Sequence, residues 1–135
     1  MGPAAALATI AKMNRVNLPA HLARIGQRMR EGWSRLAKRH GLPVRVTGHP
    51  ALSHFHFDTD DAEAVMTLYT ARMLERGFLA GAAFYPSLAH ENQHVDAFLA
   101  AADEVFAELA AAHRANDAAQ RLGTPVRQAG FGRLT

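Results

Sequence analysis

Apolar residues recur at helical spacing in two long stretches of the chain. In residues 22–36, and again in residues 95–109, they stand three or four positions apart. This period gathers them on one face of an amphipathic helix. We expect the first helix to end at Gly41, because glycine readily takes the left-handed conformation of a helix terminus. The second helix is expected to begin at or near His90.

Two further helices are predicted from weaker signals. An alanine-rich segment from residue 3 to about residue 15 carries a thin apolar stripe, and a break at residues 17–19 separates it from the helix that follows. Asp60 and Glu63 have the spacing of a capping box, in which two groups satisfy backbone N–H donors at a helix start. We therefore expect a helix that begins at Asp60 and ends at Gly77.

Strand patterns lie between these helices. Apolar and polar residues alternate in residues 44–46 and 52–57, and turn-forming residues lie between the two segments. They predict a hairpin or a bent pair of strands. Residues 78–85 are a third candidate strand, and residues 126–135 could add one at the edge. The order of elements favours an α+β fold, with a small, mainly antiparallel sheet and helices packed on one face.

Length and composition limit the class of protein. The 135 residues, with a mass of 14.7 kDa, allow one domain with one core, so we interpret residues 1–135 as a single domain. No run approaches about 20 apolar residues, and the first residues lack the features of a signal peptide. The absence of cysteine excludes a disulfide scaffold, a thiolate zinc finger and a cysteine nucleophile. We expect a cytoplasmic protein with no membrane partner.

The basic residues are concentrated in one predicted helix. The net charge is only +3, but the sequence pI is about 10.0 and seven basic side chains fall within residues 24–40. A solvated helix face accounts for this pattern without a ligand. The alternative is a non-enzymatic basic interaction module that binds nucleic acid or phosphate. Because interleaved exposed aromatic residues are missing, we interpret nucleic-acid binding as the weaker hypothesis.

One segment matches a metalloprotease pattern. His90-Glu91-Asn92-Gln93-His94 satisfies H-E-x-x-H, in which two histidines on one helix face bind zinc and the glutamate polarises water. A small zinc hydrolase is therefore an alternative function. A helix that starts near His90 would place the motif at a helix end, and His113 lies about 28 Å further along the helix. We accordingly predict no metal ligand here.

Other catalytic arrangements are incomplete. His54 and His56 share one face of a strand, which by itself is a weak metal site. None of the serines lies in G-x-S-x-G, and no glycine-rich phosphate loop is present. The two lysines, Lys12 and Lys38, fall on predicted helix surfaces. We therefore assign no catalytic residue to the chain.

Several short segments, taken in order, resemble one protein family. They are Gly2-Pro3-Ala4-Ala5-Ala6-Leu7-Ala8-Thr9-Ile10, His21-Leu22-x-x-Ile25-Gly26, Gly32-Trp33, His40-Gly41-Leu42-Pro43, Arg72-Met73-Leu74-Glu75-Arg76-Gly77-Phe78-Leu79, Tyr85-Pro86-Ser87-Leu88-Ala89-His90, Val95-Asp96-x-x-Leu99 and Gly130-Phe131-x-Arg133-Leu134. Their order and spacing resemble the C-terminal small domain of class III aminotransferases, and most closely that of glutamate-1-semialdehyde aminomutase and its relatives.

The resemblance implies a part of an enzyme that uses pyridoxal phosphate (PLP). In that family a large domain carries the PLP-binding lysine, the phosphate-binding residues and most of the homodimer interface. The resemblance therefore implies that the chain alone is inactive, binds no cofactor and lacks its large-domain partner. It also implies amino-group transfer in the full-length enzyme, with Tyr85, Ser87 and His90 as candidates for the substrate side of the site. A small domain without its partner should expose an apolar patch.

Overall fold

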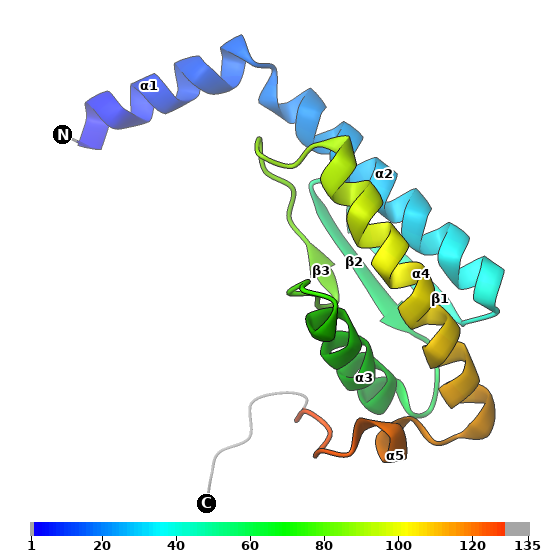
Figure 1. Cartoon of the computed structure of the whole chain (residues 1–135). Helices are drawn as coiled ribbons and strands as arrows, with labels where there is room; N and C mark the ends of the chain where they lie inside the picture. Colours follow the sequence, from blue (N-terminus) through cyan, green and yellow to red (C-terminus); the bar gives the residue numbers. More distant parts are fainter. Residues whose placement is uncertain (1, 129–135) are drawn as a thin grey trace, which may run out of the picture.

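Helices cover one face of a small sheet in the computed structural model, which describes residues 2–128 (Figure 1). The elements in chain order are α1 Gly2–Arg15, α2 Leu18–His40, β1 Val44–His49, β2 Leu52–Phe57, α3 Ala62–Glu75, β3 Ala83–Phe84, α4 Asn92–Ala115 and α5 Ala118–Leu122. Helices α2 and α3 contact the sheet, and α4 packs against both helices. This arrangement confirms the predicted α+β class. Every helix within the described residues is too short or too polar to cross a membrane.

The sheet has strand β2 at its centre. Its order is β1-β2-β3, and both neighbouring pairs run antiparallel. Phe55 and Phe57 are buried beneath the helices, whereas His54 and His56 lie on the opposite face because side chains alternate along a strand. Val46 of β1 pairs with Phe55. The predicted hairpin is therefore confirmed, with Phe55 and Phe57 on the helix-covered face.

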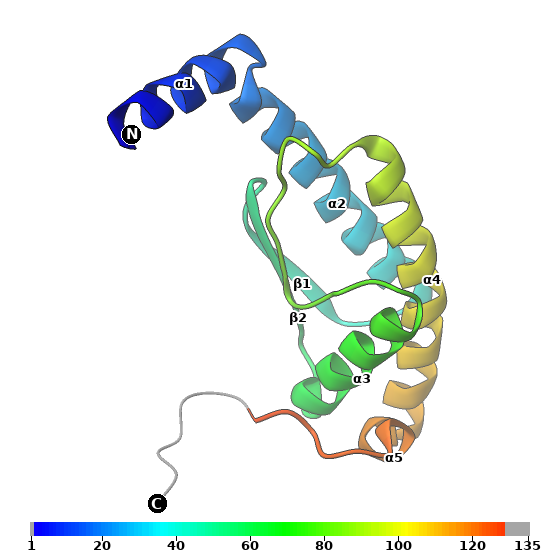
Figure 2. The ribbon, with the colours of Figure 1, turned by 60° about the vertical axis from the view of Figure 1, so that its left-hand side comes forward.

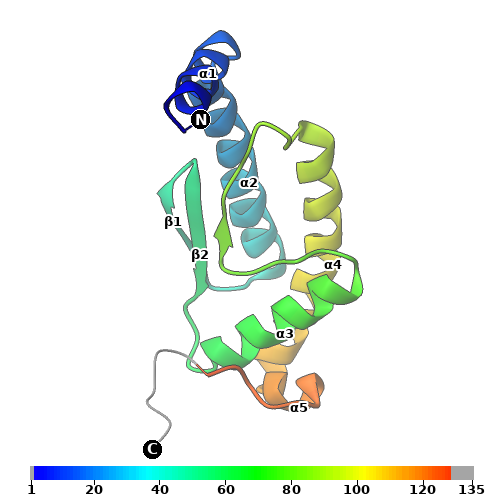
Figure 3. The same cartoon turned by 90° about the vertical axis from the view of Figure 1, so that its left-hand side faces the viewer.

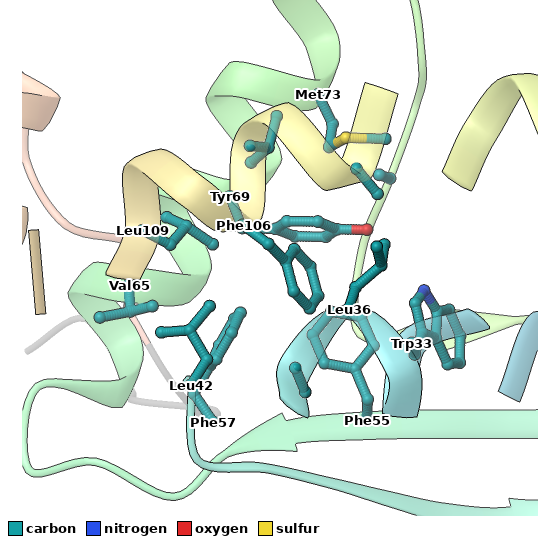
Figure 4. Packing of buried hydrophobic residues seen from close by; sticks show 14 of the residues in the cluster. Trp33, Leu36, Leu42, Phe55, Phe57, Val65, Tyr69, Met73, Phe106 and Leu109 are labelled. Carbon is teal, nitrogen blue, oxygen red and sulfur yellow. The ribbon is translucent and has the colours of Figure 1, made fainter. Parts of the chain in front are cut away.

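An aromatic cluster forms the centre of the core (Figure 4). Phe55 is fully buried, and its ring centroid lies 4.8 Å from that of Trp33 and 5.3 Å from that of Tyr69. Phe57 and Phe106 complete the cluster at 5.4 and 6.4 Å from Phe55. One side chain of the central strand thus holds α2, α3 and α4 against the sheet.

The two long helices begin and end close to the predicted positions. Helix α2 starts at Leu18 after Asn17, which takes a left-handed conformation with φ of 47°, and it is followed by Gly41 with φ of 67°. The conformation at Gly41 is the one that favours glycine after a helix. Helix α4 begins at Asn92, two residues after His90.

The structure corrects the predicted capping box. Helix α3 begins at Ala62, with Asp61 as its N-cap residue and no hydrogen bond from a capping side chain. Asp60 lies in the preceding turn. The Glu63 carboxylate instead forms an ion pair with Arg127, with a distance of 2.7 Å between Nε of Arg127 and Oε2 of Glu63. Its carboxylate therefore fastens the segment after α5 to α3 and does not cap the helix.

The third strand is shorter than predicted, and a short helix was missed. Strand β3 contains only Ala83 and Phe84, which pair with His54 and Ser53 of β2, and the Ala82 carbonyl accepts a further hydrogen bond of 2.9 Å from the Phe55 N–H. Helix α5 is held by an ion pair of 2.5 Å between Asp117 and Arg121, one helical turn apart. Residues 126–128 form no strand, and residues 129–135, which include the resembling segment at Gly130, lie outside the described residues.

The basic stretch of α2 faces acidic and polar residues of α4. Arg28 pairs with Asp96 at 2.5 Å, and Arg39 and His40 both contact Asp103 at 2.6 Å. Arg24 extends this row of contacts, as it donates a hydrogen bond of 2.7 Å to Asn92. Much of the charge that suggested a nucleic-acid surface is therefore used between two helices of the same chain.

Helix α1 projects from the body of the molecule (Figures 2 and 3). None of its residues is buried, and its apolar side chains are open to solvent. Leu7 is 70% exposed and Ile10 is 54% exposed. The expected exposed apolar patch is thus present, on a helix whose stripe has no covering element among residues 2–128.

Candidate functional site

The segment between β3 and α4 contains all three candidate residues. It runs from the sheet toward the start of α2 before it enters α4 (Figure 3). The backbone N–H of Ser87 donates to Nδ1 of His90 at 3.0 Å, and the Ser87 hydroxyl lies 2.9 Å from the same nitrogen. These two contacts fix the turn and the imidazole relative to each other.

A second histidine is held in the same manner. The backbone N–H of Glu91, the N-cap residue, donates to Nδ1 of His94 at 3.0 Å. His94 is the third residue of α4, so its ring occupies the position of the acidic side chain in a capping box. The actual capping box therefore lies at α4 and not at α3.

These hydrogen bonds determine where the ring protons are. A backbone N–H can only donate, so Nδ1 of His90 and Nδ1 of His94 both act as acceptors. The proton of each neutral ring is then on Nε2. Each ring therefore presents an N–H donor, and not a lone pair, on its outer side.

This geometry opposes a zinc site at the H-E-x-x-H segment. His90 lies before the first residue of α4, so His90 and His94 are not one turn apart on a helix. Their Nδ1 lone pairs are occupied, and a metal at Nε2 would have to displace the ring proton. Within residues 2–128, no three histidine, aspartate or glutamate side chains gather in a way that could hold a metal ion.

Metal analysis tests this conclusion. We expect the chain, loaded with zinc and then separated by gel filtration, to retain far less than one equivalent of zinc, because no ligand set is preformed. His94→Ala should leave that value unchanged. Equimolar zinc in the unmodified chain, lost in His94→Ala, would contradict the assignment and restore the hydrolase alternative.

The two histidines border an apolar hollow at the start of α4. Its volume is about 220 Å³. The lining residues are Met29, Phe78, Leu79, Phe84, His90, His94, Val95 and Phe98. The His90 ring meets the ring of Phe84 edge to face, with a centroid distance of 5.3 Å. The walls therefore come from α2, the β3 region and α4.

The three predicted site residues do not converge on this hollow. His90 lines it, but Tyr85 lies on the outer side of the sheet, where its hydroxyl is 3.5 Å from Nε2 of His54. Tyr85 is 57% exposed. Ser87 does not line the hollow, and its contacts go to His90. Sequence reasoning missed His94 as a lining residue, because Glu91 and His94 do not have the residue types of a standard capping box.

Two titratable groups outside the hollow, the Tyr69 phenol and the Arg72 guanidinium, have structural roles. Burial raises the pKa of the Tyr69 phenol well above its usual value, so this side chain stays neutral in the core. Hydrogen bonding to Glu108 raises the pKa of Arg72, which also pairs with Glu75 at 2.8 Å. His54 and His56 share one face of β2, as the strand pattern predicted, and this face is the one turned away from the helices.

The described residues do not fit PLP. Binding of this cofactor requires a lysine beside a pocket that holds the pyridine ring and the phosphate. Lys12 lies on the projecting helix α1 and Lys38 lies in the last turn of α2, and both are exposed. Among residues 2–128, therefore, neither lysine lies at the hollow beside α4.

Comparison with known proteins places the fold. No protein-family model matches the chain. Among solved structures, an omega-transaminase from Sphaerobacter thermophilus matches with a TM-score of 0.60 and 22% identity over 67% of this chain. The FumI protein of Sphingopyxis sp. MTA144, in its PLP form, matches with a TM-score of 0.61 and 24% identity over 75% of this chain. The chain has the fold of one part of these two proteins.

The match is limited to a minor part of the longer proteins. A third structure, described as a transaminase with PLP bound, matches with a TM-score of 0.58 and 20% identity over 69% of this chain. The chain spans 24%, 24% and 25% of the omega-transaminase, the PLP-bound transaminase and the FumI protein, respectively. About three quarters of each of these proteins therefore has no counterpart in the chain.

Proposed function

We propose that the chain is the C-terminal small domain of a PLP-dependent class III transaminase or aminomutase. The observation that carries this proposal is the match of its fold to about one quarter of three solved structures, two of which are described as transaminases and the third as a PLP form of the FumI protein. The order of short segments from Gly2 to Val95, which resembles the same part of class III enzymes, supports it. The complete enzyme would transfer an amino group, and PLP would supply the electron sink for that transfer.

The proposal also says which members of the family the complete enzyme is most similar to. The resemblance around Tyr85-Pro86-Ser87-Leu88-Ala89-His90 favours enzymes similar to glutamate-1-semialdehyde aminomutase. In the complete enzyme this segment would border the substrate side of the site. The contacts of 2.9 and 3.0 Å between Ser87 and His90 would then hold the turn in a defined shape and help to exclude water.

A large domain is the partner that this proposal requires. Helix α1 has no buried residue, and Leu7 and Ile10 expose most of their apolar surface. A 14-residue helix of this kind is marginal in water unless its apolar face is covered. We propose that the large domain covers α1, that the complete enzyme is a homodimer and that it is cytoplasmic.

The PLP requirement can be measured on the chain itself. After incubation with PLP and dialysis, we expect no stoichiometric visible absorbance of lysine-bound PLP, because both lysines are exposed on helix surfaces. An Arg replacement of each lysine provides a matched control that keeps the charge. A stoichiometric band that survives dialysis and disappears in Lys12→Arg or Lys38→Arg would overturn the proposal that the cofactor is held elsewhere.

A further inference from the structure

The hollow at the start of α4 combines apolar walls with two ring N–H groups. Aromatic and aliphatic side chains from three parts of the chain form its walls, and its volume is about 220 Å³. A cavity of about 150 Å³ is enough to hold benzene in a protein interior. The space therefore accommodates an apolar group as large as a ring or a branched chain.

The polar groups of the hollow are hydrogen-bond donors. His90 and His94 both line it, and a neighbouring hollow is bordered by Ala89 and the same two rings. Because each Nδ1 accepts a backbone N–H, each Nε2 carries the ring proton. Neither Nε2–H donates to another protein group within residues 2–128. The two residues that line this apolar space thus each carry a ring N–H that donates to no protein group within residues 2–128.

This combination defines the chemistry of a ligand. Ring N–H donors favour an oxygen acceptor and disfavour a metal or an ammonium group, which need lone pairs. A carboxylate accepts such hydrogen bonds more strongly than a neutral carbonyl does. Arg24 adds positive charge at the same helix end, where it donates a hydrogen bond of 2.7 Å to Asn92.

We propose that the hollow binds a small monocarboxylate whose apolar part is a ring or a branched chain. The apolar part packs against Phe78, Phe84 and Phe98, and the carboxylate accepts hydrogen bonds from Nε2 of His90 and His94. This binding site goes beyond the proposed transaminase function, since it needs no cofactor and no second domain. The binding experiment can therefore fail while the proposed transaminase function stands, and the transaminase function can fail while the hollow still binds its ligand.

A titration of the full 135-residue chain with phenylacetate tests the proposal. Ring and amide resonances of His90 and His94, followed by NMR, should shift saturably, with a dissociation constant on the order of 1 mM. Phenylacetamide has the same shape without the charge and should bind roughly fivefold more weakly, because charge-assisted hydrogen bonds are stronger. Absence of saturable shifts in the folded chain, or equal affinity for both compounds, would overturn the proposal.

Substitutions of His94 separate ligand binding from helix capping. His94→Glu keeps an acceptor for the Glu91 N–H in a standard capping box but removes the ring donor, so phenylacetate affinity should fall at least about tenfold. His94→Gln keeps both an acceptor and a donor, and its affinity should stay within about threefold of the original value. His56→Glu makes the same charge change on the outer sheet face and should leave affinity unchanged. Unchanged affinity in His94→Glu, or an equal loss in His56→Glu, would contradict the assignment.

Discussion

Phe55→Ala is expected to lower the free energy of unfolding by about 4 kcal/mol, which is typical of a buried phenylalanine truncated to alanine. Phe55 is fully buried on the central strand, and its ring packs against Trp33, Tyr69 and Phe106 from three different helices. Aromatic pairs in this geometry add to the effect of burial alone. Since small domains have only about 5–15 kcal/mol of stability, this loss is a large fraction of the total, and the variant should unfold at a clearly lower urea concentration.

Urea unfolding followed by circular dichroism measures this effect. Leu79→Ala is the matched control, because Leu79 is 93% exposed and its truncation should change stability by less than about 0.5 kcal/mol. Similar unfolding midpoints for Phe55→Ala and Leu79→Ala would show that β2 is not the element that joins the three helices to the sheet.

Gly26→Ala is the second substitution with a large expected effect. A Cβ atom at Gly26 of α2 would overlap the backbone carbonyl of Pro50, in the turn between β1 and β2. Alanine ordinarily stabilises a helix relative to glycine by about 1 kcal/mol. Here the overlap with rigid backbone should reverse the sign, so we expect a net loss of about 2 kcal/mol.

The control for this substitution is Gly81→Ala. A Cβ at Gly81 meets no atom within 4 Å, so the free energy of unfolding of the Gly81→Ala variant should change by less than about 0.5 kcal/mol. Thermal unfolding of both variants gives the comparison. A Gly26→Ala variant that is more stable than the unmodified chain would mean that α2 does not pack closely on the hairpin turn.

Local patterns predicted most of the elements. The helical period of residues 22–36 and the position of Gly41 sufficed to place α2, because both signals act within a few turns. Alternation in residues 52–57 likewise identified the buried face of β2. These predictions needed no knowledge of which elements meet in space.

The errors arose where contacts between distant residues decide the outcome. Glu63 has capping spacing, but its carboxylate pairs with Arg127, 64 positions away. The length of β3 depends on its pairing with β2, at Ser53 and His54, and not on its own apolar residues. A pattern of neighbouring residues cannot predict either contact, because both join residues far apart in the sequence.

The candidate site was predicted only in part for the same reason. His90 could be singled out from the sequence, but the hollow beside it also requires Met29 of α2 and Phe78. His94 was interpreted as part of a misleading metal motif. Its role becomes clear only once the first residue of α4 is known, because that position brings its Nδ1 to the Glu91 N–H.

A search for PLP on the native protein tests the central claim, the proposed transaminase function, most directly. The protein would be purified under native conditions from its source through an affinity tag, reduced with borohydride and mapped by mass spectrometry for the pyridoxyl group. We expect this group on a lysine of the assembly that lies outside residues 1–135, because Lys12 and Lys38 are exposed and neither lines the hollow beside α4. A pyridoxyl group on either of these two lysines, or none in the whole assembly, would contradict the account.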